Sequence, residues 1–141
     1  MQIRFETPYQ YVFYHHHVKH LLVIWEKEQR KDLYIIKEET PEELVLQYPG
    51  ETYRETVLQE LEPVFFQTLE TEEERFPAIL GATFSYQKRL IGMYYHQHRP
   101  DKEPPYFFEI KNEKLVELSD EDYAEVIKVF ANEYSEHIST D

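Results

Sequence analysis

Histidines are the residues of this sequence whose type and spacing point most directly to chemistry. Three are adjacent in the stretch YHHHVKHLLVIWEK, residues 14–27, and His20 follows three positions after the last of them. Two more histidines stand at positions 96 and 98. Neutral imidazole nitrogens suit Zn²⁺, Ni²⁺ or Cu²⁺. The H-E-x-x-H motif of a helical catalytic zinc site is absent from the sequence, so a metal here would need another arrangement.

Strand alternation decides which of these histidines act together. Successive side chains of a β-strand point to opposite faces, so His15 and His17 are expected on one face and His16 on the other. His96 and His98 would share a face in the same way. A simpler interpretation is a β-hairpin that is rich in histidine at half-exposed positions. The metal-site alternative comprises His15, His17, His96 and His98, with His20 beside the first pair.

Other signatures of catalysis are missing. The chain has three glycines, Gly50, Gly81 and Gly92, which leaves no P-loop and no dinucleotide-binding fingerprint. It also lacks a G-x-S-x-G nucleophile elbow. We therefore predict no catalytic residue, no bound cofactor and no enzymatic activity.

Composition limits the compartment and the partners. The chain has no cysteine, which removes disulfides and thiolate metal sites and favours a cytoplasmic location. The N-terminal residues MQIRFETPYQ lack the pattern of a secretion signal, and no apolar run is long enough to cross a bilayer. The formal net charge of −13 repels nucleic-acid phosphates and anionic membranes, so we expect neither as a partner.

The negative charge is concentrated in two segments. Residues 38–74 hold twelve acidic residues and one basic residue, and residues 119–141 hold seven and one. A dense array of carboxylates can imitate nucleic-acid phosphates, which makes an acidic nucleic-acid mimic one alternative function. The other interpretation is a solvated helix face that aids solubility.

The sequence also reads as one unit written twice, with similar stretches about seventy residues apart. KHLLVIWE, residues 19–26, aligns with KRLIGMYY, residues 88–95. The alignment predicts an α+β fold of two pseudo-repeated ββββα units, residues 1–74 and 75–141, with antiparallel sheets and one main helix each. We expect the two units to pack as one globular domain. The segment 68–77 is the predicted joint between them.

Local patterns predict the elements of each unit. Alternating and aromatic runs predict strands near residues 9–17, 20–26, 32–37 and 43–48, and again at 78–86, 89–96, 106–110 and 114–118. The first helix starts near Glu51 and should kink or end near Leu61, because Pro63 removes a backbone donor. The second helix follows Ser119 as N-cap. Its predicted apolar stripe is Tyr123, Val126, Ile127, Phe130, Tyr134 and Ile138.

One segment resembles a known family. YFFEIKNEKLVELSDEDYAEVIKVF, residues 106–130, is similar to the C-terminal half of the small acidic YrzB-type domain of Gram-positive bacteria. The resemblance covers residues 79–138 and rests on an acid-capped, amphipathic helix after two short strands. This chain departs from the family by carrying two units. The family is uncharacterised, so the resemblance implies no catalytic residue and no ligand.

These observations favour a non-catalytic protein-binding module of the bacterial cytoplasm with an unidentified protein partner. Aromatic residues make up 16% of the chain, more than a small core needs, and an exposed patch of them would mark a partner site. The alternatives are a metal-binding protein and an acidic nucleic-acid mimic. The sequence does not indicate an oligomeric state.

Overall fold

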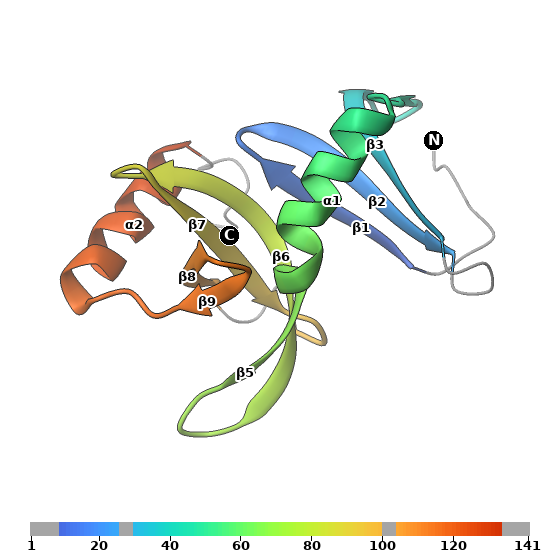
Figure 1. Cartoon of the computed structure of the whole chain (residues 1–141). Helices are drawn as coiled ribbons and strands as arrows, with labels where there is room; N and C mark the ends of the chain where they lie inside the picture. The colour runs from blue at the N-terminus through green and yellow to red at the C-terminus, as the bar shows by residue number, and fades with distance from the viewer. Residues whose placement is uncertain (1–8, 26–29, 100–103, 134–141) are drawn as a thin grey trace. The chain divides into compact units, whose positions relative to one another are not determined.

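The computed structural model of the chain describes residues 9–25, 30–99 and 104–133. The chain divides into two compact units, residues 1–60 and 61–141. Figure 1 shows their strands and helices along the chain. No helix in the described residues is both long and apolar enough to cross a membrane.

The first unit is a four-stranded antiparallel arrangement in the order β4-β3-β2-β1. Helix α1 lies over the face that carries Phe13, His20 and Leu22, because the Tyr53 hydroxyl bonds to the His20 ring and Val57 is buried. Its elements are β1 (Gln10–His15), β2 (Val18–Trp25), β3 (Arg30–Glu39), β4 (Leu44–Gln47) and α1 (Glu51–Phe65).

The second unit pairs five strands in the order β5-β6-β7-β8-β9, again antiparallel. Helix α2 packs on this sheet through Phe130, whose ring lies 5.2 Å from Phe107 and 6.0 Å from Phe84. Its elements are β5 (Phe66–Glu70), β6 (Arg75–Tyr86), β7 (Arg89–His96), β8 (Tyr106–Lys111), β9 (Lys114–Val116) and α2 (Asp120–Glu133).

The predicted fold class is wrong. The described residues form nine strands of one large sheet with two helices, and not two pseudo-repeated ββββα units with antiparallel sheets. The extra strand is β5, which overlaps the predicted joint at residues 68–70. It pairs with β6 from Phe66 opposite Ile79 to Glu70 opposite Arg75. Local periodicity shows that a strand exists but not which strand it pairs with, so the acidic composition of residues 68–77 indicates a linker where the structure has a hairpin.

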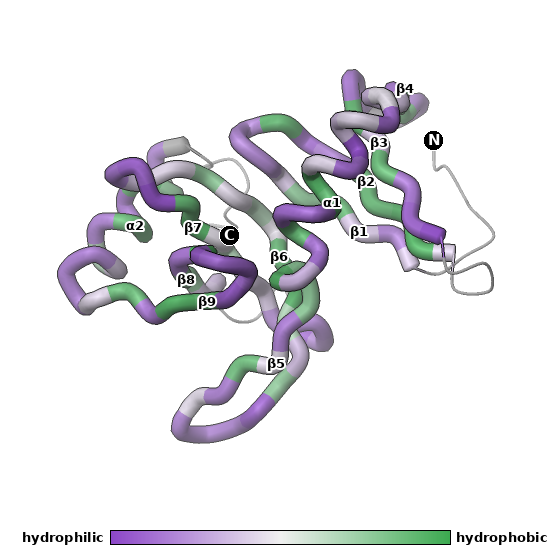
Figure 2. Tube along the Cα trace, viewed as in Figure 1, coloured by the Kyte–Doolittle hydropathy of each residue, from purple (hydrophilic) through white to green (hydrophobic). Residues whose placement is uncertain are grey.

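That acidic run is a hairpin turn. The Thr71 backbone N–H donates to the Glu74 carbonyl at 2.8 Å, and its hydroxyl accepts from the backbone N–H of Glu73 and Glu74. The β3–β4 turn is built in the same way, on Thr40 and Glu43. Figure 2 shows the tip of the β5–β6 hairpin as hydrophilic, which suits carboxylates in solvent.

Most local predictions are confirmed. Helix α2 starts after Ser119, whose hydroxyl accepts from the Asp122 backbone N–H at 3.1 Å. Val126 and Phe130 of the predicted stripe are buried, whereas Ile127 is 45% exposed. Tyr134 and Ile138 lie outside the described residues. Helix α1 does not end near Leu61; it continues through Pro63 to Phe65.

Candidate metal centre

The adjacent histidines form a turn rather than a strand. Strand β1 ends at His15, which pairs with Val18, and His16 and His17 form the two-residue connection. Both have a positive φ, 48° and 71°, as the twist of a tight hairpin requires. The predicted sharing of one strand face by His15 and His17 is therefore wrong, because alternation stops where the strand stops.

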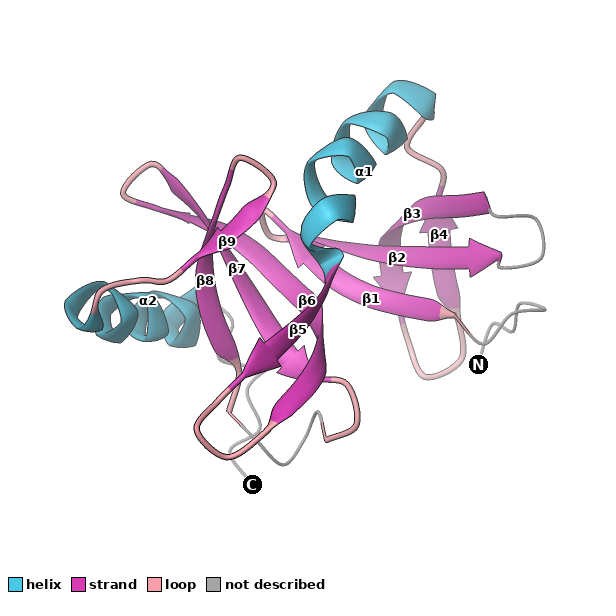
Figure 3. Ribbon diagram, turned by 60° about the horizontal axis from the view of Figure 1, so that its bottom comes forward, coloured by secondary structure: helices cyan, strands magenta, loops and turns pink. Residues whose placement is uncertain are grey.

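Two further turns have the same backbone. Gln87 and Lys88 connect β6 to β7 with φ values of 49° and 64°, and Asn112 and Glu113 connect β8 to β9 at 53° and 62°. None of the three turns contains glycine, although this turn type favours it. Figure 3 shows these hairpins as pairs of adjacent strands joined at short loops. The left-handed conformation of His16 and His17 is thus a property of the turn and not special to histidine.

The turn places its histidines in different surroundings. His15 is 9% exposed, and His20, three residues into β2 after the turn, has no exposed surface. His16 and His17 are exposed. The His15 and His16 rings are 4.3 Å apart and tilted, so these two neighbours lie together at the end of the hairpin.

His20 is a satisfied core residue. Its Nδ1 lies 2.8 Å from the Val18 carbonyl, which can only accept, so Nδ1 carries the proton. Nε2 is then the acceptor for the Tyr53 hydroxyl, also at 2.8 Å. Burial lowers the pKa of His20, which keeps the ring neutral. Both ring nitrogens make hydrogen bonds, so His20 is not a metal ligand. Its ring lies 6.1 Å from the His15 ring and packs beside it.

A carboxylate from α1 meets the other two rings. One ligand atom from each of His15, His16 and Glu60 lies within 4.8 Å of the other two, and within the described part of the chain this is the group of three that could hold a metal. His15 Nε2 and Glu60 Oε1 are 3.6 Å apart. Burial lowers the pKa of His15 to about 4, with smaller contributions from His16 and His20, so its ring is neutral at physiological pH.

The second histidine group lies in the other unit and has different chemistry. His96 is 3% exposed and stacks on Phe76, with ring centroids 4.4 Å apart. Its Nδ1 accepts from the backbone N–H of His98 and of Arg99, at 3.1 and 3.2 Å. The proton of a neutral ring must then be on Nε2, which is buried without a hydrogen-bond partner and lies 3.8 Å from Glu74 Oε1.

That tautomer does not suit a metal. An imidazole binds a cation through an unprotonated nitrogen, and the only buried nitrogen left on His96 carries its proton. His98 is exposed, 6.1 Å from the His96 ring. The structure describes each histidine group within its own unit. Of the predicted metal residues, His15 is part of the candidate site, while His17, His96 and His98 are not among its ligands.

Sequence reasoning missed His16 and Glu60. The prediction for His16 is wrong because the predicted strand runs to residue 17, two residues beyond the end of β1 at His15. Glu60 is one of 28 acidic residues, and only the docking of α1 on the hairpin selects it. A signal for the turn was available: the strands predicted at residues 78–86 and 89–96 leave Gln87 and Lys88 as a two-residue connection, and the same spacing in the histidine run ends the strand at His15.

No protein-family model, curated protein or solved structure matches this chain. The resemblance of residues 79–138 to the YrzB-type domain therefore stays a prediction.

Proposed function

We propose that this protein binds a transition-metal dication through His15, His16 and Glu60. The observation that carries the proposal is the position of these three ligand atoms within 4.8 Å of one another. Two imidazoles and a carboxylate form a donor set found in zinc and iron sites, and they leave further coordination positions for water.

Ligand spacing supports a metal better than a hydrogen bond. A tetrahedral metal about 2.1 Å from two ligand atoms holds them about 3.4 Å apart. His15 Nε2 and Glu60 Oε1 are 3.6 Å apart, which is close to that spacing and longer than a normal hydrogen bond.

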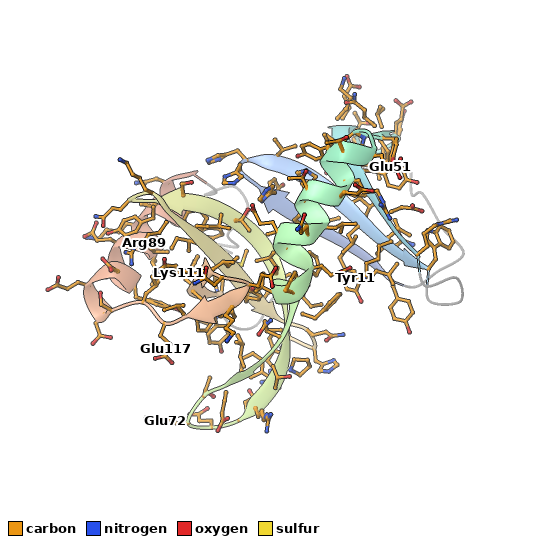
Figure 4. The ribbon with its side chains drawn as sticks, in the orientation of Figure 1. Tyr11, Glu51, Glu72, Arg89, Lys111 and Glu117 are labelled. Atoms are coloured by element: carbon orange, nitrogen blue, oxygen red, sulfur yellow. The ribbon has the colours of Figure 1, made fainter. Side chains whose placement is uncertain are left out.

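Local charge supports it as well. In the second unit a guanidinium meets the helix carboxylate: Arg89 donates to Asp122 at 2.8 Å, and Figure 4 shows Arg89 at the end of the hairpin nearest α2. In the first unit Glu60 faces the neutral His15 ring, and within the described residues no lysine or arginine forms an ion pair with it. A bound dication would supply the missing positive charge.

The donor set indicates which metals to expect. Imidazole nitrogen favours Zn²⁺, Ni²⁺ and Cu²⁺, whereas Mg²⁺ and Ca²⁺ prefer all-oxygen sites. We expect one equivalent of Zn²⁺ or Ni²⁺ per chain and no competition from Mg²⁺.

Equilibrium dialysis of the untagged chain against Zn²⁺ tests the proposal. His16→Gln and Glu60→Gln should each weaken binding by at least about tenfold, or about 1.4 kcal/mol. His16→Gln preserves the turn, because Gln87 occupies the same position of the β6–β7 turn. His17→Asn and His98→Gln are matched controls and should leave the affinity unchanged. Equal affinity in all four variants, or no bound zinc in the parent chain, would overturn the proposal.

We also propose a cytoplasmic location, which the absence of cysteine supports.

Protein binding and nucleic-acid mimicry stay predictions. The exposed large apolar side chains are spread over both units and do not select one binding face; they are Tyr9, Val12, Val18, Tyr48, Phe66, Val116 and Ile127.

A further inference from the structure

Helix α1 crosses the boundary between the two compact units. The first unit ends at Glu60 and the second begins at Leu61, whereas the helix runs without interruption from residue 51 to residue 65. One residue of the candidate metal site is therefore the last residue of the first unit.

The two ends of this helix are attached to different units. In the first, the Tyr53 hydroxyl bonds to the ring of His20, and the Arg54 guanidinium donates to the Lys31 carbonyl at 3.0 and 2.7 Å. In the second, the Val64 carbonyl accepts from the Tyr94 hydroxyl at 2.5 Å. The hydrogen bonds of Tyr53 and Arg54 to the first unit lie in the first turn of the helix.

Pro63 removes one hydrogen bond of the helix close to the boundary. Pro63 lies inside α1 and has no backbone N–H, so the Gln59 carbonyl lacks its intrahelical donor. Proline also disfavours helical geometry at Glu62, the residue before it. Close to this point, the Glu60 carboxylate oxygen Oε1 lies 3.6 Å from Nε2 of His15 in the first unit.

We propose that metal binding at His15, His16 and Glu60 stiffens helix α1 around Pro63. The inference rests on the proposed function, because it needs the metal to bind there. A bound metal would fix Glu60 to the β1–β2 turn. Any opening of α1 around Pro63 that displaces Glu60 would then require release of the metal, so occupied protein would open less often.

Hydrogen exchange measures this opening residue by residue. The amides of Leu61, Glu62, Val64 and Phe65 report on the helix across the boundary, and the amide of Val126 in α2 is an internal reference. At free Zn²⁺ of about 100 times Kd, exchange that requires metal release should slow by about 100-fold. The Val126 amide should not change, and Mg²⁺ in place of Zn²⁺ should have no effect.

Two variants sharpen the test. Glu60→Gln should abolish the zinc effect on these amides. Pro63→Ala restores the missing donor and leaves the ligands in place, so it should slow exchange without metal and reduce the further slowing by zinc.

Dialysis on the same samples separates the two proposals. One equivalent of bound zinc with unchanged exchange at residues 61–65 would overturn the stiffening and leave the metal site standing. Absence of bound zinc would overturn both.

Discussion

The β1–β2 and β6–β7 hairpins have the same turn and opposite chemistry around it. Each turn is two residues long, with both φ values positive and no glycine. The third residue after each turn has no exposed surface, but it is His20 in the first hairpin and Ile91 in the second. A shared backbone can therefore support a polar, hydrogen-bonded core in one unit and an apolar core in the other.

The same difference extends to the helices. Asp122 of α2 meets the permanent cation Arg89, and this hydrogen bond lowers the pKa of the carboxyl group. Glu60 of α1 meets two imidazoles. The Arg89 guanidinium is always charged and pairs with Asp122 at any physiological pH. A neutral imidazole gives Glu60 no positive charge unless the ring is protonated or binds a metal ion. A carboxylate beside arginine therefore has a permanent cationic partner, whereas a carboxylate beside neutral imidazoles does not.

The largest expected effect is on the apolar core of the second unit. Phe84 is completely buried against Phe107 and Phe130, so Phe84→Ala should lower the free energy of unfolding by about 3–5 kcal/mol. Phe13→Ala should cost less, because Phe13 stacks on the polar His20 ring. Urea unfolding followed by residue-resolved NMR measures both. A smaller loss for Phe84→Ala than for Phe13→Ala would contradict the comparison.

The next effect concerns the buried hydrogen bond of the first unit. Tyr53→Phe leaves His20 Nε2 buried without a donor and should cost about 1–3 kcal/mol of unfolding free energy. Tyr123→Phe is the matched variant in the second unit, where the tyrosine hydroxyl accepts from the partly buried Phe107 N–H at 3.2 Å. It should cost less.

Replacing both partners tests the cause. His20→Ile combined with Tyr53→Phe removes donor and acceptor together, and Ile91 shows that isoleucine suits this position of the hairpin. The double variant should recover part of the stability that Tyr53→Phe loses. If the double variant instead loses as much unfolding free energy as the two single variants together, the buried hydrogen bond is not the cause of the Tyr53→Phe effect.

Acid should destabilise the first unit through His15. The pKa of His15 is about 4 in the folded chain and 6.5 in an ordinary environment, because burial disfavours the charged ring. As the pH falls, the unfolded chain binds the proton at a higher pH than the folded chain does. The contribution of His15 to the free energy of unfolding should therefore be constant above about pH 6.5 and decrease between pH 6.5 and pH 4. The groups around the ring are His16, His20 and Glu60.

His15→Gln separates this contribution from the rest. In metal-free buffer the variant should show a shallower decline of unfolding free energy between pH 6.5 and 4 than the parent chain. Part of the slope should remain, since burial also lowers the pKa of His20. An identical slope in both proteins would show that His15 titrates alike in the folded and unfolded chains.

The smallest effect is expected at the ion pair of the second unit. Arg89→Gln removes the partner that lowers the pKa of Asp122, so its contribution is present at neutral pH and lost as the pH falls through the carboxyl range. Both side chains are partly solvated, and such pairs contribute little. Thermal unfolding at pH 7 should show a smaller change than for Tyr53→Phe; a larger one would contradict this.

Several elements of the fold were predictable because their determinants are local. Helix α2 has its cap at Ser119 and its apolar periodicity within one segment, and the β6–β7 turn stands out as the polar pair Gln87 and Lys88 between apolar runs. Strand β5 was not predictable, since its partner β6 follows an acidic turn that resembles a linker.

The candidate site was only half predictable. The histidine run pointed to the correct hairpin, but three identical residues hide where a strand ends and a turn begins. Glu60 comes from a helix 44 positions after His16, and its approach depends on the docking of α1 over His20. Pairings of that kind are set by tertiary packing, which no local pattern records.

We propose above that the two neighbouring imidazoles of His15 and His16 and the Glu60 carboxylate bind one metal ion. Long-range ¹H–¹⁵N NMR of histidine-labelled protein during a Zn²⁺ titration tests it directly, because a ring nitrogen that binds metal changes its shift and its pH dependence. We expect shift changes at His15 and His16 that are complete at one equivalent of Zn²⁺, with little change at His96 and His98. After Glu60→Gln we expect no zinc-dependent change at His15 or His16. Zinc-dependent shifts at His96 or His98, or at His15 and His16 irrespective of Glu60, would contradict it.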